Sequence, residues 1–274
     1  MIQLGKIQAL NVVKKTDFGV YLGKEELKVL LPKKQVSEDL DIGDAIEVYV
    51  YKDSMDRIIA TTKKPYITLG QLAVLEVKEV AKVGAFLDCG LEKDLLLPFK
   101  EQTYTLNAKD KCLVVQYIDK SDRLCASMKV YEHLSSDSPY SKDDRVSGFV
   151  YDIKKGLGAF VAVDNKYSAL IEEKELLPSV KRGMVVNARV TKVREDGKLN
   201  LSLREKSYIQ MDDDAKIVFE RIEAMGGRLP FTDKADAEFI KEEFNMSKNA
   251  FKRAVGRLLK EDKIVINEDS IIKK

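Results

Sequence analysis

The sequence contains a single histidine, His133, among its 274 residues. A histidine-based catalytic triad or a multi-histidine metal site would have to be built around this one side chain. The sequence also lacks GxSxG, a Walker-type loop, and a GxGxxG that a helix follows. These absences argue against large classes of enzymes, and we expect neither a catalytic residue nor a cofactor.

Cysteine and long apolar runs are scarce as well. Cys89, Cys112 and Cys125 are an odd number without CxxC spacing, which argues against a disulfide framework and a thiolate metal site. No stretch approaches 18 apolar residues, and the first residues alternate between apolar and polar. We therefore expect no membrane span, no signal peptide, no membrane partner, and location in a reducing cytoplasm.

What the chain does contain is typical of a packed protein. Hydrophobic residues make up 45% and charged residues 34% of the sequence, which argues against general disorder. Lysine and arginine number 47 against 45 acidic residues, so the formal net charge is only +2. A nucleic-acid partner would therefore have to be bound by a local basic patch.

The chain repeats itself three times, over residues 1–65, 66–140 and 141–207. The repeats align on glycines, on the residue that follows an LL or LI pair, and on a pair of charged residues four apart. These positions are Gly19, Gly84 and Gly158; Pro32, Pro98 and Glu172; and Asp53/Arg57, Asp119/Arg123 and Arg194/Lys198. A period of this length is too long for a solenoid, so each repeat is expected to form a small domain.

Each repeat contains five short runs of strand-like apolar pattern. In the first repeat these are IQALNVV, GVYL, VLLP, AIEVYVYK and RIIAT, with turn-like clusters between them. Five short strands suit a small closed barrel of the OB type, because closure removes exposed sheet edges. The glycine of the second run predicts a bulge or bend that places Phe18 beside Tyr21.

These motifs resemble the S1-type RNA-binding domain: Gly-aromatic-apolar in strand two, LLP after strand three, GD before strand four, and D-x-x-x-R before strand five. The resemblance implies an RNA face made by the strand-two aromatics, a strand-three residue and the loop pair. The residues carried over are Phe18, Tyr21, Asp53 and Arg57; Phe86, Asp119 and Arg123; and Phe160, Arg194 and Lys198.

Each copy departs from the family pattern. The strand-three histidine common in the family is replaced by Pro32, Pro98 and Glu172, and the first aromatic by Val83 and Leu157 in the second and third copies. We therefore expect each single site to be weak, and we expect the first two copies, which are less basic than the third, either to add weaker RNA contacts or to act as a spacer.

Residues 208–274 follow a different pattern. An apolar stripe from Ala215 to Met225 predicts a helix, GGRLPFTD ends it, and ADAEFIKEEFN predicts a second helix. Ser247 can cap a third helix, and KIVINEDSIIKK predicts a hairpin. Three helices and a hairpin predict an α/β winged-helix domain. The expected fold is therefore multidomain and mainly β, with three tandem five-stranded S1-type barrels followed by a winged helix.

The basic residues gather in the last two domains. Residues 141–207 hold 14 basic and 10 acidic residues, a net charge of +4, and the third helix of the winged helix concentrates lysine and arginine. We expect these two domains to form the main nucleic-acid surface. Besides Phe160, the predicted RNA contacts are Lys154, Lys155, Arg189, Lys192, Arg194, Lys198, Lys248, Lys252, Arg253 and Arg257.

The order of three S1-like domains and a winged helix resembles the conserved virulence factor B family of bacterial proteins. The resemblance implies RNA binding and an effect on the expression of virulence genes. The hypothesis is a non-catalytic protein that binds single-stranded RNA and regulates gene expression. Three alternatives stay open: a protein-interaction scaffold, a DNA-binding regulator that uses the winged helix, and a nuclease built on carboxylates such as Asp212–Asp214.

Overall fold

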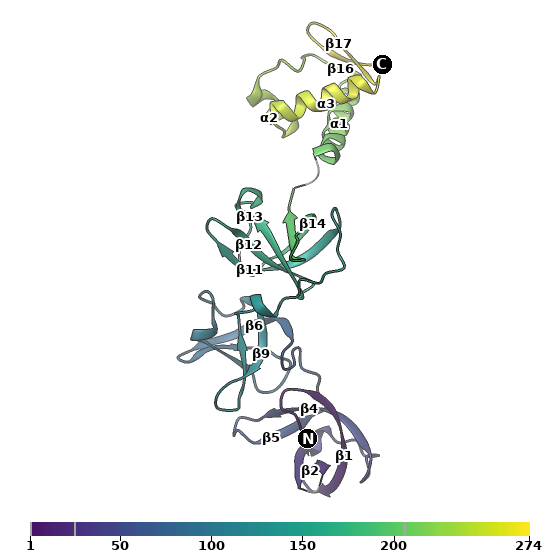
Figure 1. Cartoon of the computed structure of the whole chain (residues 1–274). Helices are drawn as coiled ribbons and strands as arrows, with labels where there is room; N and C mark the ends of the chain where they lie inside the picture. The colour runs from purple at the N-terminus through teal and green to yellow at the C-terminus, as the bar shows by residue number, and fades with distance from the viewer. Residues whose placement is uncertain (1, 25, 205–206) are drawn as a thin grey trace. The chain divides into compact units, whose positions relative to one another are not determined.

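The structure is a computed structural model that describes residues 2–24, 26–204 and 207–274, and the side chains of residues 207–212 are not described. It divides into two compact units, Met1–Leu203 and Arg204–Lys274. The first unit contains three barrels and the second contains the helical domain (Figure 1). Within the described residues, no helix is both long and apolar enough to span a bilayer.

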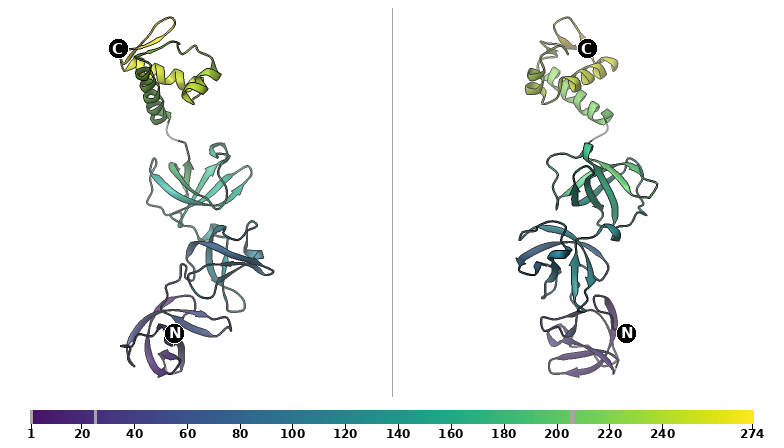
Figure 2. Two further views of the ribbon diagram at one scale, coloured as in Figure 1. Left: turned by 180° about the vertical axis from the view of Figure 1, so that it is seen from behind. Right: turned by 60° about the vertical axis from the view of Figure 1, so that its left-hand side comes forward.

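Fifteen strands of the first unit form three closed barrels of five strands each, as the repeats predicted (Figure 1, Figure 2). The first barrel contains β1 (Ile7–Thr16), β2 (Gly19–Lys24), β3 (Leu27–Pro32), β4 (Ala45–Lys52) and β5 (Ile58–Thr61). The second contains β6 (Leu72–Ala81), β7 (Gly84–Leu87), β8 (Leu95–Pro98), β9 (Lys111–Ile118) and β10 (Leu124–Ser127). The third contains β11 (Arg145–Lys154), β12 (Gly158–Val163), β13 (Tyr167–Glu172), β14 (Val185–Val193) and β15 (Leu199–Ser202).

All three barrels close with the same strand order. In the first barrel the order is β1-β2-β3-β5-β4, with β3 and β5 parallel and the other pairs antiparallel. Alternate residues point into the barrel, so Val29 and Leu31 of β3 are 2% and 0% exposed while Lys28 faces solvent. This is the five-stranded OB architecture that the repeat pattern predicted.

The glycine that opens strand two is required by a close approach of two strands. In the first barrel Gly19 has φ +149° and pairs with Pro32, and a Cβ added to it would lie 2.1 Å from the carbonyl oxygen of Leu31. Gly84 and Gly158 repeat this, with 2.3 and 2.0 Å to the carbonyls of the facing strand. The register shift lies in the neighbouring first strand, not at the glycine where the sequence placed a bulge.

A short 3-10 helix follows the third strand of each barrel, at Lys33–Gln35, Phe99–Glu101 and Glu173–Glu175. The last residue of each 3-10 helix accepts a hydrogen bond from a buried hydroxyl at the end of the fifth strand. These bonds join Thr61 to Gln35 (2.6 Å), Ser127 to Glu101 (2.7 Å) and Ser202 to Glu175 (2.8 Å). The bond satisfies a buried polar group and ties the fifth strand to the third.

Neighbouring barrels of the first unit are in direct contact. Between the first and second barrels, the Tyr49 hydroxyl donates to the side-chain oxygen of Gln116 at 3.2 Å. Between the second and third, Leu113, Val130 and Phe149 share one buried apolar cluster. Side chains at these junctions can therefore belong to a site that draws on two barrels.

The second unit contains α1 (Ser207–Ala224), β16 (Arg228–Leu229), α2 (Ala237–Phe244), α3 (Lys248–Lys260), β17 (Ile264–Ile266) and β18 (Ile271–Lys273). The strands form a sheet in the order β16-β18-β17. Ser247 caps α3 as predicted, because its hydroxyl accepts from the backbone N–H of Ala250 at 3.2 Å. The predicted winged helix is confirmed.

The core of the winged helix comes from all three helices and the hairpin. Val218 of α1, Ile240 of α2, Phe251 of α3 and Ile271 of β18 are fully buried in one cluster. The apolar residues Phe251, Ala254, Val255 and Leu258 of α3 are buried, whereas Leu259 is 46% exposed. The strand β16 was not predicted from the sequence. It lies in GGRLPFTD, the segment that was expected only to end the first helix.

Candidate nucleic-acid interface

The predicted loop pairs occupy the same position in all three barrels. The backbone N–H of Asp53 donates to the carbonyl of Arg57 at 2.9 Å and closes the hairpin between β4 and β5. The pairs Asp119/Arg123 and Arg194/Lys198 make the same bond at the same length. The side chains of these pairs, however, find different partners in each barrel.

In the first barrel the pair is closed on itself. Arg57 Nη2 lies 2.7 Å from Asp53 Oδ2, and Asp53 Oδ1 accepts from the backbone N–H groups of Met55 and Arg57. Although partial burial acts in the opposite direction, the hydrogen bonds from Arg57 and from these N–H groups hold the pKa of Asp53 below its usual value. This carboxylate organises the turn, and Arg57 stays accessible at 68% exposure.

The strand-two aromatics of the first barrel stand side by side, as predicted. The rings of Phe18 and Tyr21 are 6.3 Å apart in an edge-to-face arrangement. The ammonium of Lys28 lies 5.4 Å from the centre of the Tyr21 ring. Phe18 is 58% exposed, so this pair presents an accessible ring surface.

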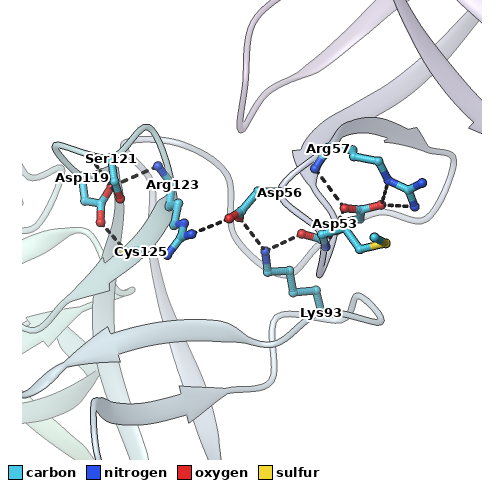
Figure 3. A network of polar contacts seen from close by, with 9 residues as sticks. Asp53, Asp56, Arg57, Lys93, Asp119, Ser121, Arg123 and Cys125 are labelled. Atoms are coloured by element: carbon cyan, nitrogen blue, oxygen red, sulfur yellow. Dashed lines mark hydrogen bonds and ion pairs between the residues drawn. The ribbon is translucent and has the colours of Figure 1, made fainter.

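In the second barrel the loop arginine is engaged with the first barrel. Arg123 forms an ion pair with Asp56, in the β4–β5 hairpin, instead of with Asp119 of its own loop (Figure 3). Asp119 accepts hydrogen bonds from the N–H and the hydroxyl of Ser121, which lower the pKa of its carboxyl group. Phe86 is half-buried on β7.

In the third barrel, four side chains form a cluster of rings and cations, which we call the third-barrel cluster: Tyr131, Lys154, Phe160 and Lys198. The rings of Phe160 and Tyr131 lie 6.1 Å apart, edge to face. The ammonium of Lys154 lies 5.2 Å from the Phe160 ring centre, and that of Lys198 lies 5.0 Å from the Tyr131 ring centre. Cations at this distance from a ring face are held by its quadrupole.

Lys198 is fixed by two partners. Its ammonium donates to the Tyr131 hydroxyl at 3.1 Å and lies 3.4 Å from Asp196. The hydrogen bond to Tyr131 is the main cause of the raised pKa of Lys198, so this side chain stays charged. Arg194, its partner in the loop, lies 3.3 Å from the same Asp196 and is 45% exposed.

Tyr131 is the member of this cluster that the sequence did not predict. It lies in the 3-10 helix Tyr131–His133, in the connector between the second and third barrels, and is 44% exposed. The sequence did contain a signal for Tyr131, namely an aromatic residue in a polar connector. A residue at such a position is not part of a barrel strand, so its ring is available for a contact outside a barrel core.

The other predicted basic residues of the third barrel differ in accessibility. Lys155 and Lys192 are exposed. Arg189 is 16% exposed and its guanidinium lies 3.0 Å from Asp143. Arg189 is therefore the predicted contact that solvent reaches least readily.

The four basic residues of α3 that were predicted to contact RNA also fall into two groups. Lys252 and Arg253 are exposed, on the face opposite the buried Phe251 and Val255. The other two are engaged within the domain, with Lys248 donating to the carbonyl of Lys234 at 3.2 Å and Arg257 to Glu261 at 2.9 Å. Lys252 and Arg253 are the pair best placed for phosphate contacts.

A metal-dependent active site finds no support in the residues that the structure describes. Among them, no three histidine, cysteine, aspartate or glutamate side chains come close enough together to hold a metal ion. The run Asp212–Asp214 that the sequence suggested for a nuclease lies in α1, and two of its three side chains, those of Asp213 and Asp214, are described.

Family profiles match almost the whole chain. An S1 domain profile matches residues 4–63 and 69–129, a profile described as the second domain of the virulence regulatory factor CvfB matches residues 132–205, and a CvfB-like winged helix domain profile matches residues 216–272. None of these is a profile of a catalytic domain.

Similar proteins match over nearly their full length. The uncharacterized protein YitL of Bacillus subtilis is 32% identical over 95% of this chain and 90% of its own. Conserved virulence factor B of Staphylococcus aureus is 28% identical over 98% of this chain and 93% of its own. The structure is also similar to a crystal structure of a multidomain protein with nucleic acid binding domains from Streptococcus pneumoniae. The match covers 99% of this chain and 98% of the pneumococcal chain, with a TM-score of 0.56 and 25% sequence identity.

Proposed function

This chain belongs to the conserved virulence factor B-like family, and from that premise we propose that it binds single-stranded RNA and regulates gene expression without catalysing a reaction. The S1 and winged-helix domains give it nucleic-acid-binding modules. The regulatory role is proposed from the name of the Staphylococcus aureus relative, and virulence genes are the proposed targets.

The observation that carries the RNA proposal is the third-barrel cluster. Phe160 and Tyr131 offer ring faces to a base, and stacking of one base on such a ring contributes about 1–3 kcal/mol. Lys154 and Lys198 lie beside these rings and would meet the phosphates on either side of the stacked base. Rings with adjacent cations suit a single strand, because bases of a duplex are already stacked on one another.

The winged helix is proposed as a second contact in the same chain. Lys252 and Arg253 of α3 would bind backbone phosphates. Two modest modules joined in one chain gain affinity through effective concentration when one strand reaches both. The same exposed pair also favours duplex DNA as the second candidate ligand, because winged helices use this helix in the major groove.

The test is a fluorescence-anisotropy titration of the full chain with oligo-uridine RNA, single-stranded DNA and duplex DNA, each at two salt concentrations. We expect RNA to bind most tightly and to weaken as salt rises. Phe160→Ala should weaken RNA binding about tenfold or more, in line with the loss of one stacked base. The matched control is Tyr21→Ala, which removes a ring with a similar lysine contact from the first barrel and should have a smaller effect.

Three other outcomes would redirect the proposal. Preference for duplex DNA that is lost in Lys252→Gln/Arg253→Gln would favour the DNA-binding regulator. Absence of binding to all three nucleic acids would favour a protein-interaction scaffold. Nuclease activity that persists through purification and is lost with EDTA would support an enzyme.

A further inference from the structure

A groove of about 1090 Å³ lies between the second and third barrels. Its walls come from the segment before β9 in the second barrel, and from the end of β11, the 3-10 helix Glu173–Glu175 and the segment before β14 in the third. A space of this size is at the upper limit of about 300–1,000 Å³ for small-molecule sites, so it suits a length of polymer. Its lining residues lie outside the strand-two aromatics and the hairpin pairs of the S1-type face.

Most of the charged side chains that line the groove are cations. Both barrels contribute to them, and they are Lys109, Lys111, Lys155, Lys181 and Arg182. The four lysines are exposed to solvent. An ammonium at the end of a flexible stem can reach a bound anion without a change of the backbone.

Two carboxylates line the groove as well, and each of them stabilises a loop. Asp110 accepts a hydrogen bond from the backbone N–H of Asn107 at 2.7 Å, and Glu173 accepts one from the backbone N–H of Gly156 at 3.0 Å. Five cations against two carboxylates leave the groove three positive charges in excess. The groove therefore attracts a ligand with several negative charges.

Arg182 joins the two walls of the groove. Its guanidinium lies 5.4 Å from the ring centre of Tyr104 in the second barrel, and it donates to Asp152 at 3.1 Å and to the carbonyl of Ile153 in the third. Tyr104 is the one aromatic residue of the lining, and its hydroxyl is buried. Since Arg182 covers this ring, the groove offers charge rather than a stacking surface, and a nucleic acid would be held here by its phosphates.

The groove adjoins the third-barrel cluster at the turn between β11 and β12. Lys154 belongs to the cluster, and the next residue, Lys155, lines the groove. Asp152 lies between the two sites, because one of its oxygens is 3.1 Å from Arg182 and the other is 3.9 Å from Lys154. A strand with a base stacked on Phe160 therefore has only this turn to pass before it enters the groove.

We propose that the groove binds the phosphates of the RNA strand that continues from the third-barrel cluster, so that the binding site extends onto the second barrel. The inference rests on the proposed RNA binding and adds three contacts to it: Lys109, Lys111 and Lys181. Lysine suits this role, because a point charge follows a backbone without selecting a base. An acidic peptide would meet the same cations, but the adjoining rings favour RNA, whose bases stack on them.

The test compares oligo-uridine RNA of about four and about twelve nucleotides, since one OB barrel covers about 4–16 nucleotides. In anisotropy titrations of the full chain at low salt, we expect the long RNA to bind about tenfold or more tightly. Lys109→Gln/Lys111→Gln/Lys181→Gln should remove most of this gain and leave the affinity for the short RNA nearly unchanged. The slope of log affinity against log salt for the long RNA should become shallower by about 2, because each phosphate contact of a single strand contributes about 0.7.

The matched control is Lys82→Gln/Lys100→Gln/Lys142→Gln, which removes three exposed lysines of the second and third repeats that do not line the groove. It should leave both the gain with length and the salt slope nearly unchanged. Equal losses in the two triple variants would overturn the proposal, as would a groove variant that keeps the full gain with length. Tighter binding of poly-glutamate than of the long RNA, lost in the groove variant, would assign the groove to an acidic peptide instead.

Failure of the proposed function would look different. In that case neither RNA binds, which would overturn both proposals, or Phe160→Ala leaves the affinity for the short RNA unchanged. The groove proposal fails alone if the short RNA binds through Phe160 and the long RNA gains nothing from the three lysines.

Discussion

The second and third barrels have the same five-strand frame and differ in what their loops contact. In the second barrel the loop cation Arg123 is paired with a carboxylate of the preceding barrel. In the third, the equivalent Lys198 lies on the ring of a connector tyrosine. The barrel frame therefore determines the position of the loop cation. The segment that packs against the loop determines whether this cation pairs with a carboxylate or lies beside an aromatic ring.

The largest effect is expected where the two barrels are alike. Gly84→Ala and Gly158→Ala should each lower the free energy of unfolding of their own barrel by about 3 kcal/mol, because the new Cβ would meet a carbonyl oxygen at 2.3 or 2.0 Å and the backbone φ is unfavourable. Amide hydrogen exchange of β7 and β12 would measure this barrel by barrel. Gly156→Ala is the control, because it has a positive φ but open space around it. If only one of the two substitutions lowered the free energy of unfolding, the two barrels would not share this constraint.

The next effect is expected where the barrels differ. Tyr131→Ala should weaken binding of single-stranded RNA by about 1–3 kcal/mol, because it removes a ring and releases Lys198. Tyr131→Phe keeps the ring and removes only the hydrogen bond, so it should cost less. Anisotropy titrations with oligo-uridine would measure both. Equal losses in the two variants would mean that the hydroxyl, not the ring, matters.

Alkaline pH should separate the second barrel from the other two, because it alone contains cysteine. Burial raises the pKa of Cys112 from 9.0 to about 12 and of Cys125 to about 11, and also raises the pKa of Cys89. A raised folded pKa means that stability is complete below pH 9 and is lost as the pH rises toward 11 and 12. The loss is at most about 1.4 kcal/mol per thiol for each pH unit. Hydrogen exchange of β9 at pH 8 and pH 9.8 would detect it. An equal loss of hydrogen-exchange protection in β4 and β14 would contradict the assignment of this effect to the cysteines.

The smallest effect contrasts a barrel glycine with a helical one. Gly256 is exposed within α3, and a Cβ added there meets nothing within 4 Å. Gly256→Ala should therefore stabilise the winged helix by about 0.5–1 kcal/mol, since alanine is the better helix former. Thermal unfolding together with hydrogen exchange of α3 would measure the gain. A loss of stability would show that α3 needs the flexibility of glycine.

The repeating features of the fold could be predicted from the sequence. Gly19, Gly84 and Gly158 mark positions where two strands approach too closely for a side chain, so they recur at equivalent places and align the repeats. The hairpin pairs could be aligned for a similar reason, since one backbone hydrogen bond closes each turn. Local spacing contains this information because the interactions are local.

The partners of the loop cations could not be predicted in this way. Asp56 and Arg123 are 67 residues apart, as are Tyr131 and Lys198, and neither pair lies within a single barrel. Such contacts depend on how one barrel packs against the next, which no periodicity within a repeat records.

The position of Tyr131 has a consequence for how this architecture can be inherited or transplanted. The third barrel is complete from β11 to β15, yet a ring of its cluster comes from the connector before it. A gene fusion that moved only residues 145–202 would carry the frame and leave this ring behind. The segment that carries this surface is therefore longer than the barrel and begins within the connector, no later than Tyr131.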